Sequence, residues 1–476
     1  MSGGHTAAGR SRTLPRMRPA RIRLGVALVA AALLAAPATA QAHGINGSAE
    51  PGIPAWLFAW GAAAVLAISF AALAALWRES RLQTPRERRL LSIPRWPQAL
   101  GGLVGVLAFV GVVYAGVAGA QEALDNVVPT WVFVVFWVLI PVLSGFLGDV
   151  FRLFNPWLAV ARGVRLLGRA TGAEAEPLPY PAWLGRWPAL LTIVGFGWLE
   201  LVYSNHDDPS TLAILGIVYA VVQLVGMSLF GIDEWEENAD GFGVYFRMFS
   251  RLSPLRWGDG ALWLRRPLEG TVGMTMQPGT VALICAAIGI TTFDGLSAGP
   301  LWSDVVPTAQ RWGGDLGLSL NTSLELVSTL GLLACIGLIA AAYRFSVSGI
   351  DGGARAFAQT LIPIALAYVV AHYATLILFQ GQALAALASD PLGQGSNWLG
   401  TADWQVNYGF IDATGIWVIQ VVAVVVGHVG GLTLAHDTAL ARGDDPDEAA
   451  RAQRSMLAIM VALTTLALWL ISSSNQ

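Results

Sequence analysis

Apolar residues along this chain gather in long, nearly uncharged runs separated by short polar stretches. Most runs are about twenty residues long, enough for a helix to cross a hydrocarbon core of ~30 Å. We predict ten such helices, near 54–77, 98–120, 129–150, 188–204, 211–231, 274–293, 322–343, 357–381, 409–435 and 454–472. The pattern therefore predicts an all-α, polytopic integral membrane protein in which 43–476 form a single ten-helix transmembrane domain.

The N-terminal segment differs from these runs in length and in its flanks. Six arginines are followed by a short apolar run at 24–36, then by Pro37 and the small-residue sequence Ala40-Gln41-Ala42. This order is typical of a secretory signal peptide. We predict that 1–42 are cleaved, which would make His43 the first residue of the mature chain. The alternative is an uncleaved N-terminal anchor.

The placement of arginine predicts how the helices are oriented. If the mature N-terminus is outside, the inward loops hold 21 arginines and the outward loops hold only Arg311. Because positive residues concentrate in cytoplasmic loops, we expect both mature termini to face outward. We therefore expect a multi-pass protein of the plasma (inner) membrane, with outer loops near 122–128, 205–210, 295–320 and 383–408.

Composition supports the membrane class and excludes several common activities. The chain is 55% hydrophobic and 12% charged, with a net charge of −3, whereas soluble domains are about a quarter charged. It contains no Walker A sequence, Rossmann glycine pattern, HExxH, paired CxxC or G-x-S-x-G, so energy from ATP would need another chain. We expect the lipid bilayer and a small solute or metal ion as partners, and no nucleic acid.

Ionisable side chains collect toward the predicted outer face. Charges within a bilayer are costly and are commonly functional. Besides Asp294, which we interpret as a cap of the sixth helix, the set consists of Glu200, His206, Asp207, Asp208, Glu325, His372 and Asp412. Carboxylates and imidazoles form proton relays and bind divalent metals. We predict a proton or substrate path that includes Glu200, Glu325, His372 and Asp412, and that continues to His428.

A metal site is the second prediction for the outer face. Its candidate ligands are His206, Asp207, Asp208 and His43, whose free α-amine could chelate a divalent metal or copper together with the imidazole. The alternatives are structural. Acidic residues cap helix N-termini, "HDDPST" can be a turn followed by a cap, and His372 can donate a hydrogen bond to a backbone carbonyl.

A second polar set lies toward the predicted inner face. His428 and His436 are two turns apart in the ninth helix, and Asp437 follows. The sixth helix begins near two methionines and contains Cys285, while Cys335 lies at a similar depth in the seventh helix. Sulfur and imidazole suit Cu(I), although such residues in membrane helices also serve as packing.

Three stretches carry a family resemblance. They are "AHGINGSAEPGIPAWLFAWGAAAVLAISFAALAALWRESRL" (42–82), "SNHDDPSTLAILGIVYAVVQLVGMSLFG" and "FIDATGIWVIQVVAVVVGHVGG". The chain resembles, over nearly its whole mature length, a family of actinobacterial polytopic membrane proteins commonly labelled fenitrothion hydrolase. The label implies cleavage of an organophosphate triester, and no catalytic motif comes with it.

Two classes of function therefore remain open. The first is transport or metal handling through an outer His/carboxylate cluster, with a path past His372 and His428. The second is a membrane-embedded organophosphate hydrolase, in which a metal held by residues of the outer cluster activates water. Its ligands would come from His43, Glu200, His206, Asp207 and Asp208.

Overall fold

The computed structural model describes residues 55–94, 96–172, 176–350, 352–443 and 453–474. The predicted signal peptide and His43 lie outside this range. Seven helical segments are long and apolar enough to cross a membrane. They are α3 (Trp96–Ala118), the α4–η1–α5 segment (Val127–Leu147), α9 (Pro209–Phe230), α12 (Thr280–Ser297), α14 (Leu320–Ser346), the α15–η3–α16 segment (Gly353–His372) and α18 (Ala413–Leu440). These helices confirm the helical class and support a membrane location.

Three further helices occupy the remaining predicted positions. They are α2 (Ala55–Leu76), α8 (Trp187–Leu201) and α20 (Arg454–Ser474). α8 has only 15 residues, whereas α2 and α20 have 22 and 21. The count of ten membrane crossings, and the orientation of the termini, therefore stay predictions.

Two segments depart from regular α-helix. The predicted helix 357–381 is interrupted: α16 (Ile362–His372) ends, Tyr373 leaves the helical path, and the π-helical η4 (Leu376–Gln380) leads into α17 (Gly381–Ser389). A second π-helical segment, η1 (Thr130–Leu139), packs against η4. Because π-helical turns are rare and frequent at functional sites, this contact points to the region around α16.

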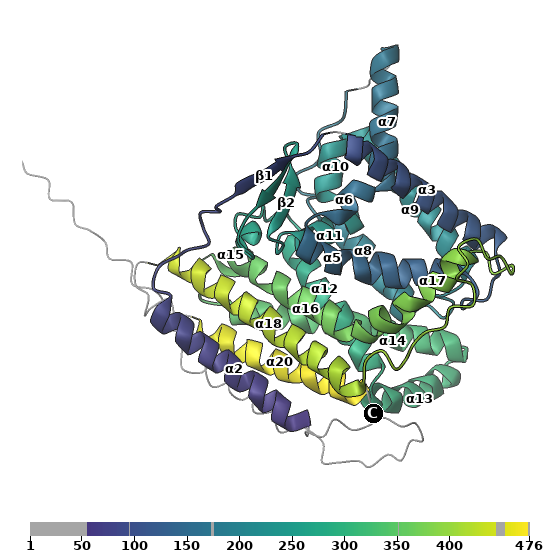
Figure 1. The fold of residues 1–476 in the computed structure, drawn as a ribbon. Helices are drawn as coiled ribbons and strands as arrows, with labels where there is room; N and C mark the ends of the chain where they lie inside the picture. Colours follow the sequence, from purple (N-terminus) through teal and green to yellow (C-terminus); the bar gives the residue numbers. More distant parts are fainter. Residues whose placement is uncertain (1–54, 95, 173–175, 351, 444–452, 475–476) are drawn as a thin grey trace, which may run out of the picture.

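The predicted outer loop 295–320 contains a helix. α13 (Pro300–Asp315) begins with a proline, which suits the first helical turn. Its apolar side chains pack against α14, and Trp302 meets Phe293 of α12 edge to face. The segment therefore extends the helical bundle at this end of the molecule (Figure 1).

The predicted inward loops fold into the body of the protein. They form α6 (Val150–Phe154), α7 (Pro156–Thr171), α10 (Ile232–Asn238), α11 (Gly241–Ser250), β2 (Leu255–Gly258), β3 (Ala261–Leu264) and η2 (Glu269–Thr271). With β1 (Arg88–Ser92), the strands make an antiparallel sheet in the order β1-β3-β2, in which Leu264 lies opposite both Arg88 and Leu255. α7 projects from the body (Figure 1).

α11 lies at the centre of the aromatic core. Its side chains are buried almost throughout, and Phe246 and Phe249 are fully enclosed. Asp240 caps the helix through the Gly243 amide and also accepts hydrogen bonds from Asn155, Trp157 and Tyr219. This fully buried carboxylate therefore fixes α7 and α9 against the start of α11.

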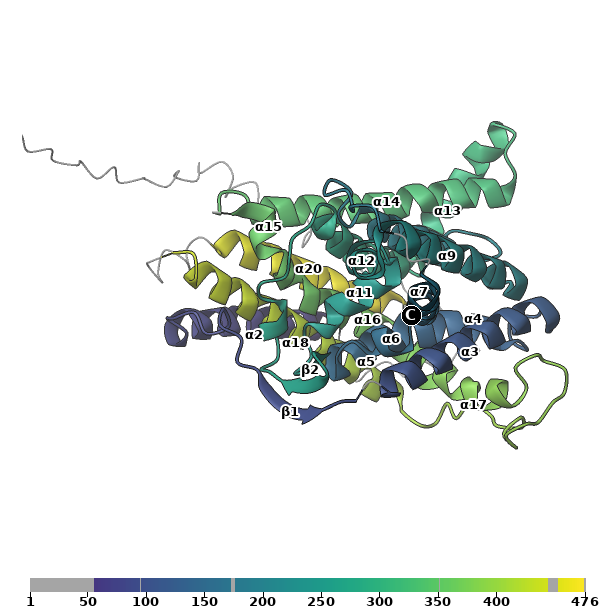
Figure 2. The same cartoon turned by 90° about the horizontal axis from the view of Figure 1, so that it is seen from above.

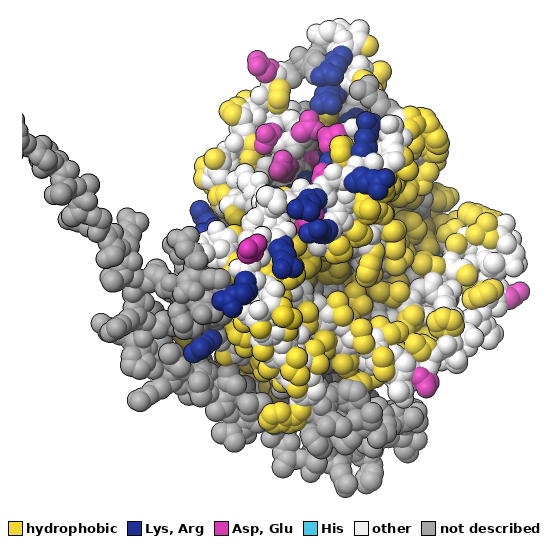
Figure 3. All heavy atoms as spheres, turned by 60° about the vertical axis from the view of Figure 1, so that its left-hand side comes forward, with side chains coloured by type: hydrophobic (Ala, Val, Ile, Leu, Met, Phe, Trp, Pro, Cys, Tyr) yellow, Lys and Arg dark blue, Asp and Glu magenta, His cyan; other side chains and the backbone are white. Residues whose placement is uncertain are grey.

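Charge is unevenly distributed over the molecule. Figures 1 and 2 place α15 (Gly353–Phe357) at one end and α13 and α17 at the other. Figure 3 shows arginine and acidic side chains gathered at one end of the visible face, above a broad hydrophobic surface. Such a separation is the arrangement that the arginine pattern predicts for a protein whose polar end meets the cytoplasm.

Candidate functional site

α8 and α12 approach closely through a glycine. A Cβ at Gly197 would lie only 2.9 Å from Ile290 side-chain carbons, so only glycine fits this crossing. One turn later along α8 comes Glu200, and one turn later along α12 comes Asp294. The crossing therefore brings two carboxylates from different helices to the same place, near enough for their charges to interact.

α16 supplies the partners of these acids. The His372 Nε2 atom lies 2.8 Å from the Asp294 Oδ2 atom, and the Tyr373 hydroxyl lies 3.4 Å from the Glu200 Oε1 atom. Glu200, Asp294, His372 and Tyr373 are called the His372 cluster below. Two of its members, Glu200 and His372, were predicted as parts of one path, and the structure brings them together.

The end of α16 makes this arrangement possible. His372 is the last helical residue, and Tyr373 turns out of the helix while its amide still donates to the Val369 carbonyl. The two rings stand almost perpendicular, with centroids 4.8 Å apart. Two consecutive side chains thus reach acids on two different helices.

Hydrogen bonding within the cluster is incomplete. Among the described residues, the buried Glu200 Oε2 and Trp137 Nε1 atoms make no hydrogen bond of good geometry, although Trp137 is close enough to act on Glu200 as a donor. Buried polar atoms are normally paired, so an unpaired carboxylate oxygen marks a place where a proton or a water can bind. The His372 and Asp294 side chains keep 19% and 18% of their surface exposed, so the pair is not sealed off.

Glu325 and Asp412 lie outside this cluster. Glu325 accepts hydrogen bonds from the Ser204 amide and hydroxyl, which ties the start of α14 to the loop after α8. It does not cap its helix, because Ser319 does so. Asp412 caps α18 through the Gly415 amide. For Asp412 the structural alternative is thus confirmed, and neither residue bonds to the cluster within the described part of the chain.

The proposed metal ligands serve local structure. Asp208 caps α9 by accepting from the Thr211 amide and the Ser210 hydroxyl, and these hydrogen bonds hold its pKa below the usual value. His206 Nδ1 lies 3.3 Å from the Tyr203 carbonyl, and Asp207 is exposed beside it. Within the described ranges, no three His, Cys, Asp or Glu side chains are grouped as a metal site. His43 lies outside those ranges.

His428 and His436 occupy separate environments. His428 is buried, and its Nδ1 atom donates 2.8 Å to the Val424 carbonyl, which leaves its Nε2 atom without a partner. His436 bonds instead to the Trp77 carbonyl. No hydrogen bond or ion pair in the described structure joins His428 to the His372 cluster, so a continuous path between them stays a prediction. Cys285 and Cys335 are buried and free.

Sequence reasoning missed Asp294 and Tyr373 as parts of the site. We interpreted Asp294 as a helix cap, but it lies inside α12 and points to His372. The predicted boundaries gave no signal for this contact, because they place Asp294 at the outer end of its helix and His372 ~13 Å below the outer end of another. Tyr373 carried no signal, because the apolar pattern runs through the break without interruption.

A buried ionic network was also missed. Arg247 pairs with both Glu236 and Asp149, and Arg152 approaches the same Glu236 carboxylate at 3.3 Å. Burial raises the pKa of Glu236 despite these two arginines. The network joins α6, α10 and α11, so it stabilises the folded inward segments and lies apart from the His372 cluster.

The geometry defines a helical membrane protein with an under-paired polar cluster in its interior. No protein-family model, curated protein or solved structure matches the chain. The resemblance to the family labelled fenitrothion hydrolase therefore stays a prediction.

Proposed function

We propose that this protein is a proton-coupled transporter of a small solute, with the His372 cluster as its proton-binding site. One observation carries the proposal: at the break that ends α16, His372 meets Asp294 while the next residue, Tyr373, meets Glu200. Ionisable groups at membrane depth are costly, and proton relays are among the functions that retain them.

Charge balance explains how the cluster would work. It holds two carboxyl groups and one imidazole. With a protonated imidazole and two carboxylates, the net charge is −1. Binding one proton at Glu200 makes the cluster neutral, and releasing it restores the charge. Because charges interact strongly in a low-dielectric interior, each proton alters the attraction between α8, α12 and α16.

Tyr373 gives the proton a route between the two acids. A phenol can donate a hydrogen bond to one carboxylate while its oxygen accepts one from a protonated neighbour. Its hydroxyl already lies at Glu200, and it interacts with Asp294 as well. A proton that arrives at the partly exposed His372–Asp294 pair can therefore pass to Glu200 without crossing apolar packing.

The helix irregularities support solute transport over a static role. Many transporters bind solutes where membrane helices are interrupted, because the freed backbone groups line the site. Here the α16 break and the two π-helical segments η1 and η4 are adjacent. A change of charge at Glu200 would act directly on this region, which couples proton binding to movement of the chain.

Proton flux in proteoliposomes tests the proposal. Purified protein would be reconstituted with a trapped pH-sensitive dye, and panels of amino acids, sugars, organic cations, divalent metals and copper would be added outside. We expect at least one solute class to drive proton movement. Glu200→Gln and Asp294→Asn should reduce this flux by about 100-fold or more, since each removes a proton acceptor.

Asp304→Asn is the matched control, because Asp304 is an exposed acid of α13 away from the cluster. It should transport like the unmodified protein. Solute uptake that proceeds without proton movement, or that survives both cluster substitutions, would refute the proton role. Ester hydrolysis by metal-loaded protein without any uptake would favour the hydrolase instead.

A further inference from the structure

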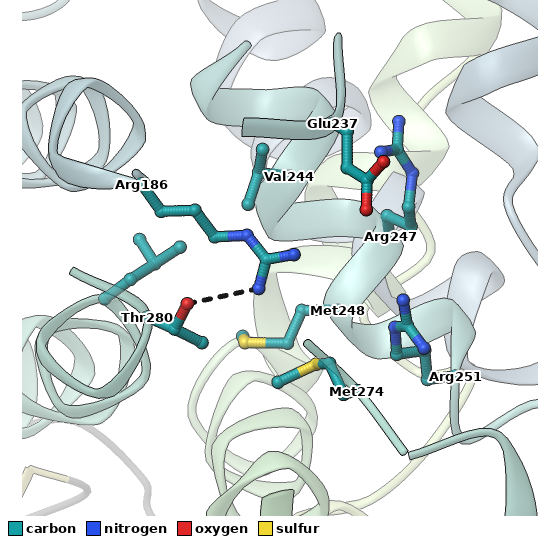
Figure 4. A pocket seen from close by; sticks show the side chains of 9 residues that line it. Arg186, Glu237, Val244, Arg247, Met248, Arg251, Met274 and Thr280 are labelled. Carbon is teal, nitrogen blue, oxygen red and sulfur yellow. Dashed lines mark hydrogen bonds between the residues drawn. The ribbon is translucent and has the colours of Figure 1, made fainter. Parts of the chain in front are cut away.

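A separate cavity lies at the opposite end of α8 from Glu200. Arg186, which precedes α8, is ~20 Å from Glu200 at 1.5 Å per helical residue. The cavity has a volume of about 20 Å³ and lies between the starts of α8 and α12 and the helices α10 and α11 (Figure 4). Its lining consists of Arg186, Glu237, Val244, Arg247, Met248, Arg251, Met274, Thr280 and Leu283.

Two glycines hold Arg186 at the wall of this cavity. Gly185 and Gly279 both have positive φ, and a Cβ at Gly279 would lie 2.8 Å from the Trp187 nitrogen. The close approach lets the Arg186 amide donate to the Pro278 carbonyl at 2.6 Å. The side chain then extends past the first turn of α12, where Nη1 donates to the Thr275 carbonyl and the Thr280 hydroxyl, each at 3.2 Å.

Not every N–H group of the Arg186 guanidinium makes a hydrogen bond within the described residues. The residue is 5% exposed, and its buried Nε atom has no partner among the described residues. No carboxylate forms an ion pair with it in the described structure, where its side-chain hydrogen bonds go to neutral oxygens. Burial lowers the pKa of Arg186. An arginine this enclosed normally has an anionic partner, so the cavity contains an unmatched cation.

The neighbouring groups add to the positive character. Arg251 donates to the Gly270 carbonyl, and burial together with the nearby arginines lowers its pKa to about 10. Arg247 is matched by the buried ionic network of Glu236 and Asp149. The first turn of α12 has no side-chain cap, so its amides contribute further partial positive charge.

One carboxylate faces this positive surface. Glu237 belongs to the exposed side of α10, and Figure 4 shows its carboxylate directed toward the same space as the Arg186 guanidinium. Leaving aside the matched Arg247, the lining holds two arginines and one glutamate. An occupant must therefore be an anion that also tolerates a hydrogen-bond acceptor.

We propose that this cavity binds a phosphate group, with Arg186, Arg251 and Thr280 as donors and with Glu237 accepting a hydrogen bond from the phosphate's remaining proton. Guanidinium groups match the oxygens of phosphate in geometry and charge. A phosphate group has an ionisable proton with a pKa of about 6, so its protonated form is accessible near neutral pH and a carboxylate acceptor can stabilise it. Sulfate has no such proton, so the Glu237 carboxylate, which only accepts, repels it.

Binding of inorganic phosphate is the first arm of the test. Protein in nanodiscs made only of phosphatidylcholine would be titrated calorimetrically with phosphate and with sulfate. We expect phosphate to bind in preference to sulfate, and Arg186→Gln to weaken phosphate binding by about tenfold or more. Arg89→Gln, an exposed position on β1 with the same loss of charge, should bind phosphate normally.

Glu237→Gln provides a second variant that keeps every arginine and changes an exposed residue. We expect this variant to reduce the ratio of phosphate affinity to sulfate affinity by about tenfold, because the repulsion of sulfate is removed. Arg251→Gln should weaken phosphate binding as Arg186→Gln does. These two variants test the site even if Arg186→Gln yields too little folded protein.

Nanodiscs that contain phosphatidic acid form the second arm, because a lipid headgroup offers the same chemistry. The cavity would be assigned to a lipid if phosphatidic acid stabilises the protein while free phosphate does not bind. Arg251→Gln should then remove that stabilisation. If neither probe binds, or if binding is equal in Arg251→Gln and Arg89→Gln, the proposal is overturned. Neither result depends on the proton-flux assay of the His372 cluster.

Discussion

Two carboxylates in this protein, Asp437 and Glu200, show how similar residues take different roles. Asp437 is fully buried in α18 and accepts hydrogen bonds from five residues of one segment. The donors are Trp77, Ser80, Arg81, Leu82 and Gln83. Glu200 has one hydrogen bond, of 3.4 Å to Tyr373, and its other oxygen makes none of good geometry in the described structure.

This difference separates a structural acid from a chemical one. A carboxylate surrounded by donors rigidifies its surroundings, and removing it leaves those donors unsatisfied. A carboxylate with a free oxygen loses little when it gains a proton. Hydrogen-bond saturation therefore distinguishes the two better than burial does, and three substitutions test it.

The largest effect should come from Asp437→Ala. The buried Leu82 amide and the other, partly buried donors would lose their acceptor together, so we expect a loss of about 3–5 kcal/mol in folding free energy. Thermal unfolding in detergent and the yield of monodisperse protein would measure it. Glu200→Gln is the matched comparison and should cost about 0.6 kcal/mol, the average for one hydrogen bond in a membrane. Equal losses of folding free energy in the two variants would contradict the distinction between a structural and a chemical acid.

An intermediate effect is expected for His372→Ala. The change leaves Asp294 without its partner at 2.8 Å, which should lower the folding free energy by about 1.5–3 kcal/mol. Proton flux should be lost as well. His372→Gln keeps a donor and should recover most of the folded yield but not the flux. Flux that recovers with glutamine would show that the imidazole serves only as a hydrogen-bond donor.

Asp208→Ala should give the smallest change, because this half-buried acid only caps the N-terminus of α9. Loss of a cap costs about 1 kcal/mol. The hydrogen bonds from Thr211 and Ser210 lower the folded-state pKa of Asp208. The contribution of Asp208 to the folding free energy is therefore fully present above a pH of about 4, the ordinary pKa of aspartate. It is lost as the pH falls through the lowered pKa. Melting temperatures of the variant and the parent should converge in acid; a constant difference would contradict this.

The sequence was sufficient to predict the helices but not the break in α16. α3 and α9 lie where uninterrupted apolar runs predict them. The run that contains Tyr373 looks the same, because no glycine or proline marks the interruption. Nothing local in the sequence marks it, and the two residues at the break, His372 and Tyr373, contact acids on two other helices.

The same limit applied to the site. Glu200 and His372 could be found as charged groups in apolar surroundings. Their connection through Asp294 depends on the Gly197–Ile290 crossing, which needs knowledge of which helices are neighbours. The acidic stretch at 233–240 was misleading in the opposite way: it has the composition of a solvated surface, yet Glu236 and Asp240 are buried.

The Asp437 contacts have a consequence for biosynthesis. Trp77 and Asp437 are separated by 360 positions in the chain, and α2 packs against α18 and α20, which are made last. At about 5–20 residues per second, the ribosome needs roughly 20–70 s to reach Asp437 after Trp77. During that interval the segment after α2, which carries the donors, has been synthesised, but their acceptor Asp437 has not. The first described helix can thus reach its final place only when translation is nearly finished.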